Sequence, residues 1–76
     1  MSIKIGKIYR YIGSVLDMFT NTIDSGTIDS QYVNSISKGE CCIVLKQHLN
    51  EIFILKPRGE FGWVFHFANE WTEVCP

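Results

Sequence analysis

The chain has 76 residues, 46% of them hydrophobic and 20% charged. We predict one small domain spanning residues 1–76. Its core must be dense, because a chain as short as about 60 residues buries only about 60% of its unfolded surface. The net charge of −1 argues against a protein that binds nucleic-acid phosphates or an acidic membrane mainly through charge.

The first predicted element is a strand within residues 2–13. Two tyrosines alternate with residues of another kind, in the order Ile8, Tyr9, Arg10, Tyr11 and Ile12. This is the two-residue period of a strand, and Gly13 ends the pattern. Both tyrosines are therefore expected on one face of the strand.

Residues 14–37 form a long insertion after this strand. Ser14 followed by Asp17 resembles a helix N-terminal capping pattern, and apolar residues recur at helical spacing at Val15, Leu16, Phe19 and Ile23. A second, weaker helical set is Ile28, Tyr32, Val33 and Ile36. Serine, threonine and asparagine are frequent here and compete for backbone hydrogen bonds, so an ordered loop is the alternative to either helix.

The middle of the chain contains three apolar runs, at residues 40–46, 51–56 and 61–67. They are rich in β-branched and aromatic residues, which favour strands. The connections at residues 47–50 and 57–60 are short, and the second contains Pro57 and Gly59, which favour a turn. We predict an antiparallel three-stranded meander, followed by a last strand at residues 71–75, which gives five strands in a mainly β fold.

The order of these elements is similar to that of a Src-homology-3-like barrel. The similarity lies in a strand carrying Tyr9 and Tyr11, a long loop, a strand introduced by Lys38-Gly39-Glu40, a distal hairpin, Gly62-Trp63-Val64 and a closing strand. The resemblance implies five strands in two orthogonally packed sheets and, for the family, peptide recognition on an aromatic groove. The groove tryptophan of the family is replaced by the region Asn50-Glu51-Ile52, so a preference for proline-rich peptides is not expected here.

The resemblance also sets an expected register for the meander. It points one set of side chains into the barrel: Cys42, Val44, Phe53, Leu55 and Val64. The other set points outward and is nearly as apolar: Cys41, Ile43, Leu45, Ile52, Ile54, Trp63 and Phe65. The opposite register would place four large rings of residues 61–67 in one small core, which close packing tolerates poorly. We expect residues 14–37 to fold back over the outer face, or another chain to cover it.

The residue types that support catalysis or metal binding are sparse. The three cysteines are Cys41, Cys42 and Cys75, an odd number that does not predict a disulfide framework. Neither His48 nor His66 has neighbours at metal-ligand spacing, and a pairing of Cys41 with His66 would lack an orienting carboxylate. We therefore expect no enzyme, no metal and no cofactor.

Aromatic residues are the best functional candidates in the sequence. We expect a docking surface bordered by Arg10 and Arg58 and made by Tyr9, Tyr11, Trp63, Phe65 and Trp71, with core packing as the alternative for each ring. The predicted function is a non-enzymatic module that binds another protein, such as a phage accessory protein or an inhibitor of a host protein. The alternatives are a self-associating structural subunit and a small-barrel binder of single-stranded nucleic acid.

The sequence also bears on the compartment. It shows no signal-peptide pattern and no apolar run of membrane-spanning length. The expected location is the cytoplasm, or the host cytoplasm if the protein is viral, with no membrane partner.

Overall fold

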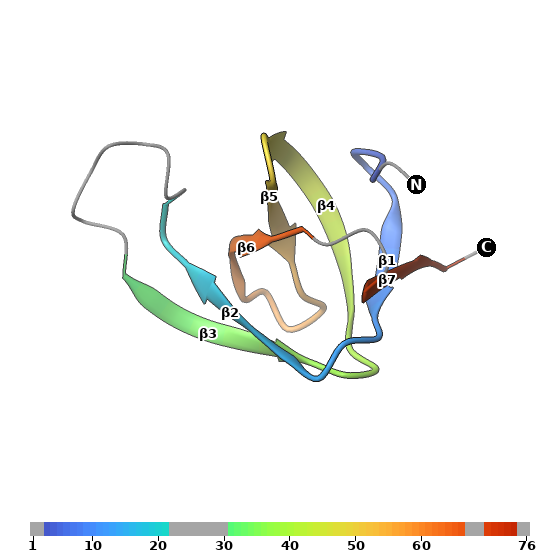
Figure 1. The fold of residues 1–76 in the computed structure, drawn as a ribbon, viewed down its shortest axis with the longest axis horizontal. Coiled ribbons are helices and arrows are strands. Elements are labelled where there is room, and N and C mark those ends of the chain that lie inside the picture. The colour runs from blue at the N-terminus through green and yellow to red at the C-terminus, as the bar shows by residue number, and fades with distance from the viewer. Residues whose placement is uncertain (1–2, 22–30, 67–69, 75–76) are drawn as a thin grey trace.

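Seven strands form one antiparallel sheet in the computed structural model, which describes residues 3–21, 31–66 and 70–74 (Figure 1). They are β1 (Ile8–Tyr11), β2 (Val15–Phe19), β3 (Tyr32–Ser37), β4 (Cys41–His48), β5 (Glu51–Leu55), β6 (Phe61–Phe65) and β7 (Trp71–Glu73). The order across the sheet is β3-β2-β6-β5-β4-β1-β7. The prediction of a mainly β fold is confirmed, but there are seven strands instead of five, and the described strands do not close into a barrel, since β3 and β7 end the sheet.

The predicted meander is present as β4, β5 and β6. Its first turn is the two-residue connection Leu49-Asn50, in which Leu49 has a φ of 52°. Its second turn contains Gly59 at a φ of 92°, a conformation that glycine adopts without steric cost. Of the predicted third strand, Phe67 lies outside the described residues.

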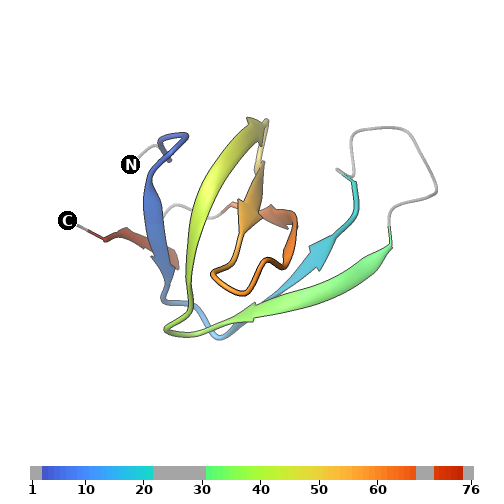
Figure 2. The ribbon, with the colours of Figure 1, turned by 180° about the vertical axis from the view of Figure 1, so that it is seen from behind.

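The insertion forms two strands where helices were predicted. β2 and β3 make an antiparallel hairpin, in which Leu16 lies opposite Ile36 and Met18 opposite Asn34. Leu16 and Met18 alternate with more exposed residues, and this strand period prevails because pairing satisfies the backbone of both segments. Ile23 and Ile28 lie outside the described residues. In Figure 2, β2 and β3 run together away from the meander.

The two terminal strands lie side by side at the other end of the sheet. β1 pairs with β4 on one edge and with β7 on the other. The structure places Tyr11 opposite Trp71 across the β1–β7 ladder. The strand predicted within residues 2–13 begins only at Ile8, because Gly6 turns the chain at a φ of 86°. Cys75, predicted in the last strand, lies outside the described residues.

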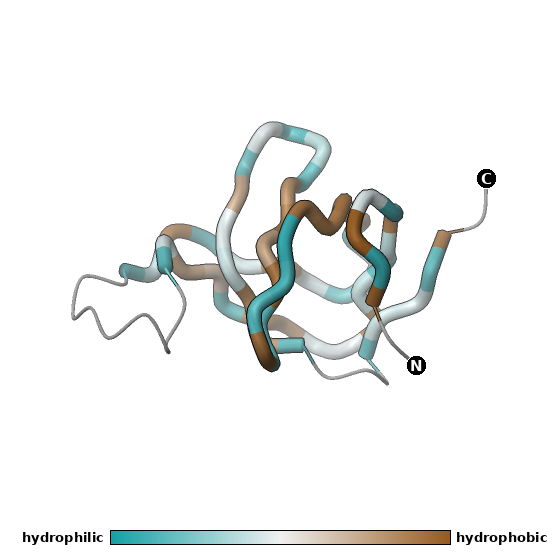
Figure 3. Tube along the Cα trace, turned by 90° about the horizontal axis from the view of Figure 1, so that it is seen from above, coloured by the Kyte–Doolittle hydropathy of each residue, from teal (hydrophilic) through white to brown (hydrophobic). Residues whose placement is uncertain are grey.

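One face of the sheet forms the core. Side chains from all seven strands are buried there, with Ile3 added from the N-terminal segment: Tyr9, Tyr11, Met18, Ile36, Cys42, Val44, Ile52, Ile54, Val64 and Trp71. Hydrophobic stretches of the chain accordingly gather near the centre of the molecule (Figure 3).

The predicted register is wrong for β5. Cys42, Val44 and Val64 face the core as predicted, but Ile52 and Ile54 also face it, while Phe53 and Leu55 are only half-buried. The cause is a β-bulge in β4, where the register shifts between Val44 and Lys46. Without it, counting back from the turn would oppose Val44 to Leu55, whereas the extra residue Leu45 brings Val44 opposite Ile54.

Candidate docking surface

Three of the aromatic residues predicted to dock a partner are in the core instead. Tyr9, Tyr11 and Trp71 are 1%, 1% and 2% exposed. The Tyr11 and Trp71 rings are 4.9 Å apart, and the Tyr11 hydroxyl donates a hydrogen bond of 2.7 Å to Glu70 Oε2. Burial and this bond raise the pKa of Tyr11 to about 12. These residues stabilise the junction of β1 and β7 and are removed from the candidate surface.

Trp63 and Phe65 lie on the face opposite the core, as predicted. Both are half-buried, and Trp63 lies opposite Phe53 on β5 and opposite Phe19 on β2. Arg10 and Arg58 are exposed, the first on β1 and the second in the turn after β5. The structure thus keeps two aromatic and two basic members of the predicted set at the surface.

The outer face carries two rows of apolar side chains that cross several strands. Residues directly opposite each other in a ladder share a face, so the printed pairs define both rows. The first row is Ile8, Ile43, Leu55 and Phe61, and the second is Phe53, Trp63 and Phe19, continued by Tyr32 on β3. We call these two rows the outer face. Of the two predicted covers for this face, residues 14–37 or another chain, the first is wrong for the described residues, because β2 and β3 extend the sheet and add Phe19 and Tyr32 to this face.

The aromatic rings of the outer face contact one another. The Phe53 ring is 5.2 Å from Trp63 and 5.8 Å from Phe61, centroid to centroid. The Lys46 ammonium lies 5.8 Å from the Phe53 centroid. Phe61 is 57% exposed and Ile8 49%, so both ends of the first row are open to solvent. Phe53 and Leu55 were missed from the sequence because their facing depends on the bulge at Leu45. Phe61 shares a face with Trp63 by alternation along β6, a signal that could have added it to the predicted surface.

A buried lysine joins β3 to the turn between β5 and β6. Lys56 is 6% exposed, and its Nζ lies 3.1 Å from Glu40 Oε2 and 3.4 Å from Glu60 Oε1. The same ammonium donates a hydrogen bond of 2.9 Å to the Ser35 carbonyl. The hydrogen bond from the Ser37 amide lowers the pKa of Glu40, and the hydrogen bond and charge of Lys56 lower it further.

These contacts close part of the free edge of β3. The Lys38 amide donates a hydrogen bond to the Ser14 carbonyl, just beyond the ends of β2 and β3. Because hydrogen-bonded and non-hydrogen-bonded pairs alternate along an antiparallel ladder, the backbone groups of Ser35 and Ser37 point away from β2. Asn34 Oδ1 and Lys56 bond to the amide and carbonyl of Ser35, and Glu40 bonds to both groups of Ser37. Three side chains and the Glu40 backbone amide therefore satisfy groups that a neighbouring strand satisfies elsewhere in the sheet.

Two shallow grooves of about 340 Å³ each flank the turn between β5 and β6. One lies between Val33 on β3 and the Phe53 and Phe61 rings, and it also contacts Glu60. The other is lined by aliphatic residues of the first row together with Cys41 and Pro57. Both grooves belong to the outer face.

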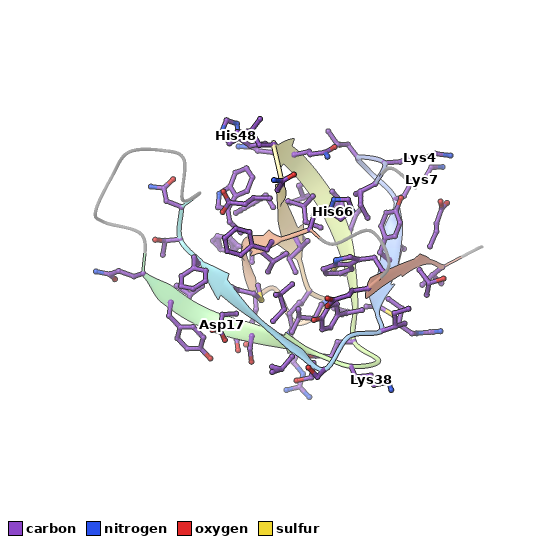
Figure 4. The ribbon with its side chains drawn as sticks, viewed as in Figure 1. Lys4, Lys7, Asp17, Lys38, His48 and His66 are labelled. Carbon is purple, nitrogen blue, oxygen red and sulfur yellow. The ribbon has the colours of Figure 1, made fainter. Side chains whose placement is uncertain are left out.

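The described residues do not assemble a metal or nucleophilic centre. No group of three or more histidine, cysteine, aspartate or glutamate side chains within residues 3–21, 31–66 and 70–74 could hold a metal ion. Cys41 and His66 lie near opposite ends of β4. Cys41 is its first residue, whereas the His66 amide donates a hydrogen bond to the carbonyl of Asn50, in the turn that follows its last residue. Cys42 is buried, which raises the pKa of its thiol to about 12. Figure 4 shows His48 at the tip of the meander, apart from His66.

Comparison with protein-family models, curated proteins and solved structures finds no match to this chain. Among the described residues, no helix has the length and apolar character needed to span a membrane.

Proposed function

We propose that this protein is a non-enzymatic binding module that docks a partner protein through the outer face of its sheet. The observation that carries the proposal is that both faces of the sheet are apolar, although only one is buried in the core. Contiguous apolar patches beyond about 300–600 Å² on a soluble protein usually mark an interface. A module of this kind acts by occupying a surface, which suits an accessory or inhibitory role.

Trp63 is the proposed centre of the interface. It lies in the row between Phe53 and Phe19, and aromatic side chains surrounded by other apolar groups carry most of the binding energy at such surfaces. Phe65 extends the outer face on β6, and Arg10 and Arg58 are proposed as rim residues. Lys4 and Lys7 lie at one end of β1 and Lys38 at the far side of the molecule, an arrangement that supports protein docking over nucleic-acid binding (Figure 4).

For the fold, we propose a Src-homology-3-like arrangement of the strands, in which the β2–β3 hairpin takes the place of the long loop. The order of elements supports it, since β4, β5 and β6 are consecutive neighbours and β7 pairs with β1. The proposal concerns the path of the chain and not a closed barrel.

The test begins with affinity capture from the native organism, followed by titration of the purified partner. Trp63→Ala is expected to weaken binding about tenfold or more, because a central aromatic contributes over 1 kcal/mol. Phe65→Ala should weaken it less. Leu49→Ala is the matched control, since Leu49 is 67% exposed at the tip of the meander and lies outside both rows.

Three results would contradict the proposal. The first is a folded Trp63→Ala variant that binds the partner as tightly as the natural protein. The second is a dimer in light scattering that Trp63→Ala abolishes, which would assign the outer face to self-association. The third is a salt-sensitive mobility shift with a single-stranded oligonucleotide, which would favour nucleic-acid binding.

A further inference from the structure

The groove between β3 and the β5–β6 hairpin combines aromatic and acidic groups. We call it the β3–β6 groove. Its floor contains Phe53 and Phe61, whose rings meet edge to face at 72°, and Val33 faces them from β3. Gly59 and Gly62 also line it and add no side chain to its volume. With a volume of about 340 Å³, it is at the small end of the range for ligand sites and suits one long side chain.

The wall of the groove carries unbalanced negative charge. The single positive charge of Lys56 is paired with two carboxylates, those of Glu40 and Glu60. Of these, Glu60 is farther from the ammonium, 43% exposed, and the one that lines the groove. Asn34 donates a hydrogen bond to Glu60 and holds it at the wall.

The exposed cation of the turn between β5 and β6 belongs to a different groove. Arg58 lines a separate groove with Glu40 and Cys41, and its charge contributes to the lowered pKa of Glu40. Arg58 is not among the residues that line the β3–β6 groove. The Glu60 carboxylate therefore shares the Lys56 ammonium with Glu40, and no lysine or arginine is among the residues that line the groove.

An aromatic floor beside a carboxylate is suited to a cationic group. The Phe53 ring already has the Lys46 ammonium over it at 5.8 Å, and Lys46 does not line the groove. A guanidinium fits better than an ammonium, because it is planar, weakly hydrated and able to stack on a ring while it bonds to a carboxylate.

We propose that the β3–β6 groove binds an arginine side chain of the partner protein, with its guanidinium between the Phe61 ring and the Glu60 carboxylate. That this arginine belongs to a partner protein rests on the proposed docking function. The recognition chemistry itself rests only on the groove, so it can be tested without the partner.

The experiment titrates n-butylguanidinium and its neutral isostere N-butylurea into isotope-labelled protein. Amide shifts of Val33, Gly59, Glu60 and Gly62 are followed by NMR. The guanidinium should shift these amides, and the urea should bind roughly threefold to fivefold more weakly, the effect of one exposed cation contact. Glu60→Gln should remove this difference, and Glu73→Gln, a carboxylate change outside the groove, should preserve it.

Phe61→Leu provides a second variant with little risk to folding, because Phe61 is already 57% exposed. It should also weaken guanidinium binding, since it keeps the apolar volume and removes the ring. Equal binding of the urea and the guanidinium, or unchanged binding in both variants, would overturn the proposal. Equal binding of n-butylammonium would overturn the choice of arginine. A groove that fails these tests leaves the effect of Trp63→Ala on the partner intact, so the two proposals can fail separately.

Discussion

The β4–β5–β6 meander and the β2–β3 hairpin belong to one sheet but are held in it by different forces. The meander is joined by long ladders, and its central strand is paired on both sides along its whole length. The hairpin meets the meander through a single ladder pair, Phe19 opposite Trp63. It is also attached by the buried side chains of Met18 and Ile36, by the contacts of Lys56 and by the hydrogen bond from Asn34 to Glu60.

Close packing at one point explains how a single ladder pair suffices. A Cβ placed on Gly62 would be 3.1 Å from both the Met18 Cβ and the Phe19 carbonyl oxygen. The hairpin therefore rests directly on the backbone of β6, and a residue with a Cβ at position 62 would require a small shift of the hairpin. The meander is stabilised by its backbone ladders, and the hairpin by side chains that fit against it.

The largest effect on stability is expected from two matched substitutions, each of which leaves a cavity, one in the meander and one in the hairpin. Ile54 and Ile36 are both fully buried, and substitution by alanine should cost about 3–4 kcal/mol at Ile54 and about 2–3 kcal/mol at Ile36. Ladders on both sides of Ile54 prevent the cavity from collapsing, whereas Ile36 lies on an end strand that can shift. Urea unfolding followed by tryptophan fluorescence measures both losses. An equal or larger loss at Ile36 would contradict the comparison.

The next effect comes from Lys56→Met, which removes the ammonium that joins β3 to the turn after β5. We expect a loss of about 1–2 kcal/mol, below the cost of breaking a fully buried pair, because Glu40 and Glu60 are partly exposed and can be hydrated. Hydrogen exchange should accelerate in β2 and β3 and stay unchanged in β5. Lys7→Met is the control at an exposed lysine, and acceleration spread evenly over all strands would show that the hairpin is not separately attached.

A smaller, stabilising effect is expected at the first turn of the meander. Leu49 has a φ of 52°, in the left-handed region that costs a residue with a Cβ about 1 kcal/mol or more. Leu49→Gly should raise the unfolding free energy by about 0.5–1 kcal/mol after the entropy cost of glycine. Leu49→Ala keeps the Cβ and should give no such gain. A stability gain of the same size for both variants would assign the effect to the lost apolar side chain.

The smallest effect concerns pH and His66, which follows β6. Desolvation by burial lowers the pKa of His66, and its Nε2 is buried without a described partner. The folded state thus favours the neutral ring, so the unfolded state binds more protons as the pH falls below about 6.5. Stability should therefore decrease on acidification and level off below the folded pKa. Unfolding at about pH 7.5 and about pH 5.5 should show less pH dependence in His66→Gln than in His48→Gln.

The meander could be predicted because its signals are local. Runs of β-branched and aromatic residues lie between short turns, and such strands pair with their neighbours in sequence. The hairpin could not, because Val15, Leu16 and Phe19 also fit a helical period, and only the available partners decide between helix and strand. Val15 to Phe19 form a strand by pairing with β3, and Phe19 also lies opposite Trp63, a residue far away in the sequence.

The candidate surface shows the same division. The sequence established that the chain has more apolar strand residues than one core face can hold, and it placed Trp63 and Phe65 outside. The tertiary structure decided which rings are outside with them. One extra residue, Leu45, inverts the facing of β5 relative to β4, and pairing with Trp71 draws Tyr11 into the core. Alternation along a strand is a property of the sequence, but which of its two faces is buried depends on a register that only the paired strands can set.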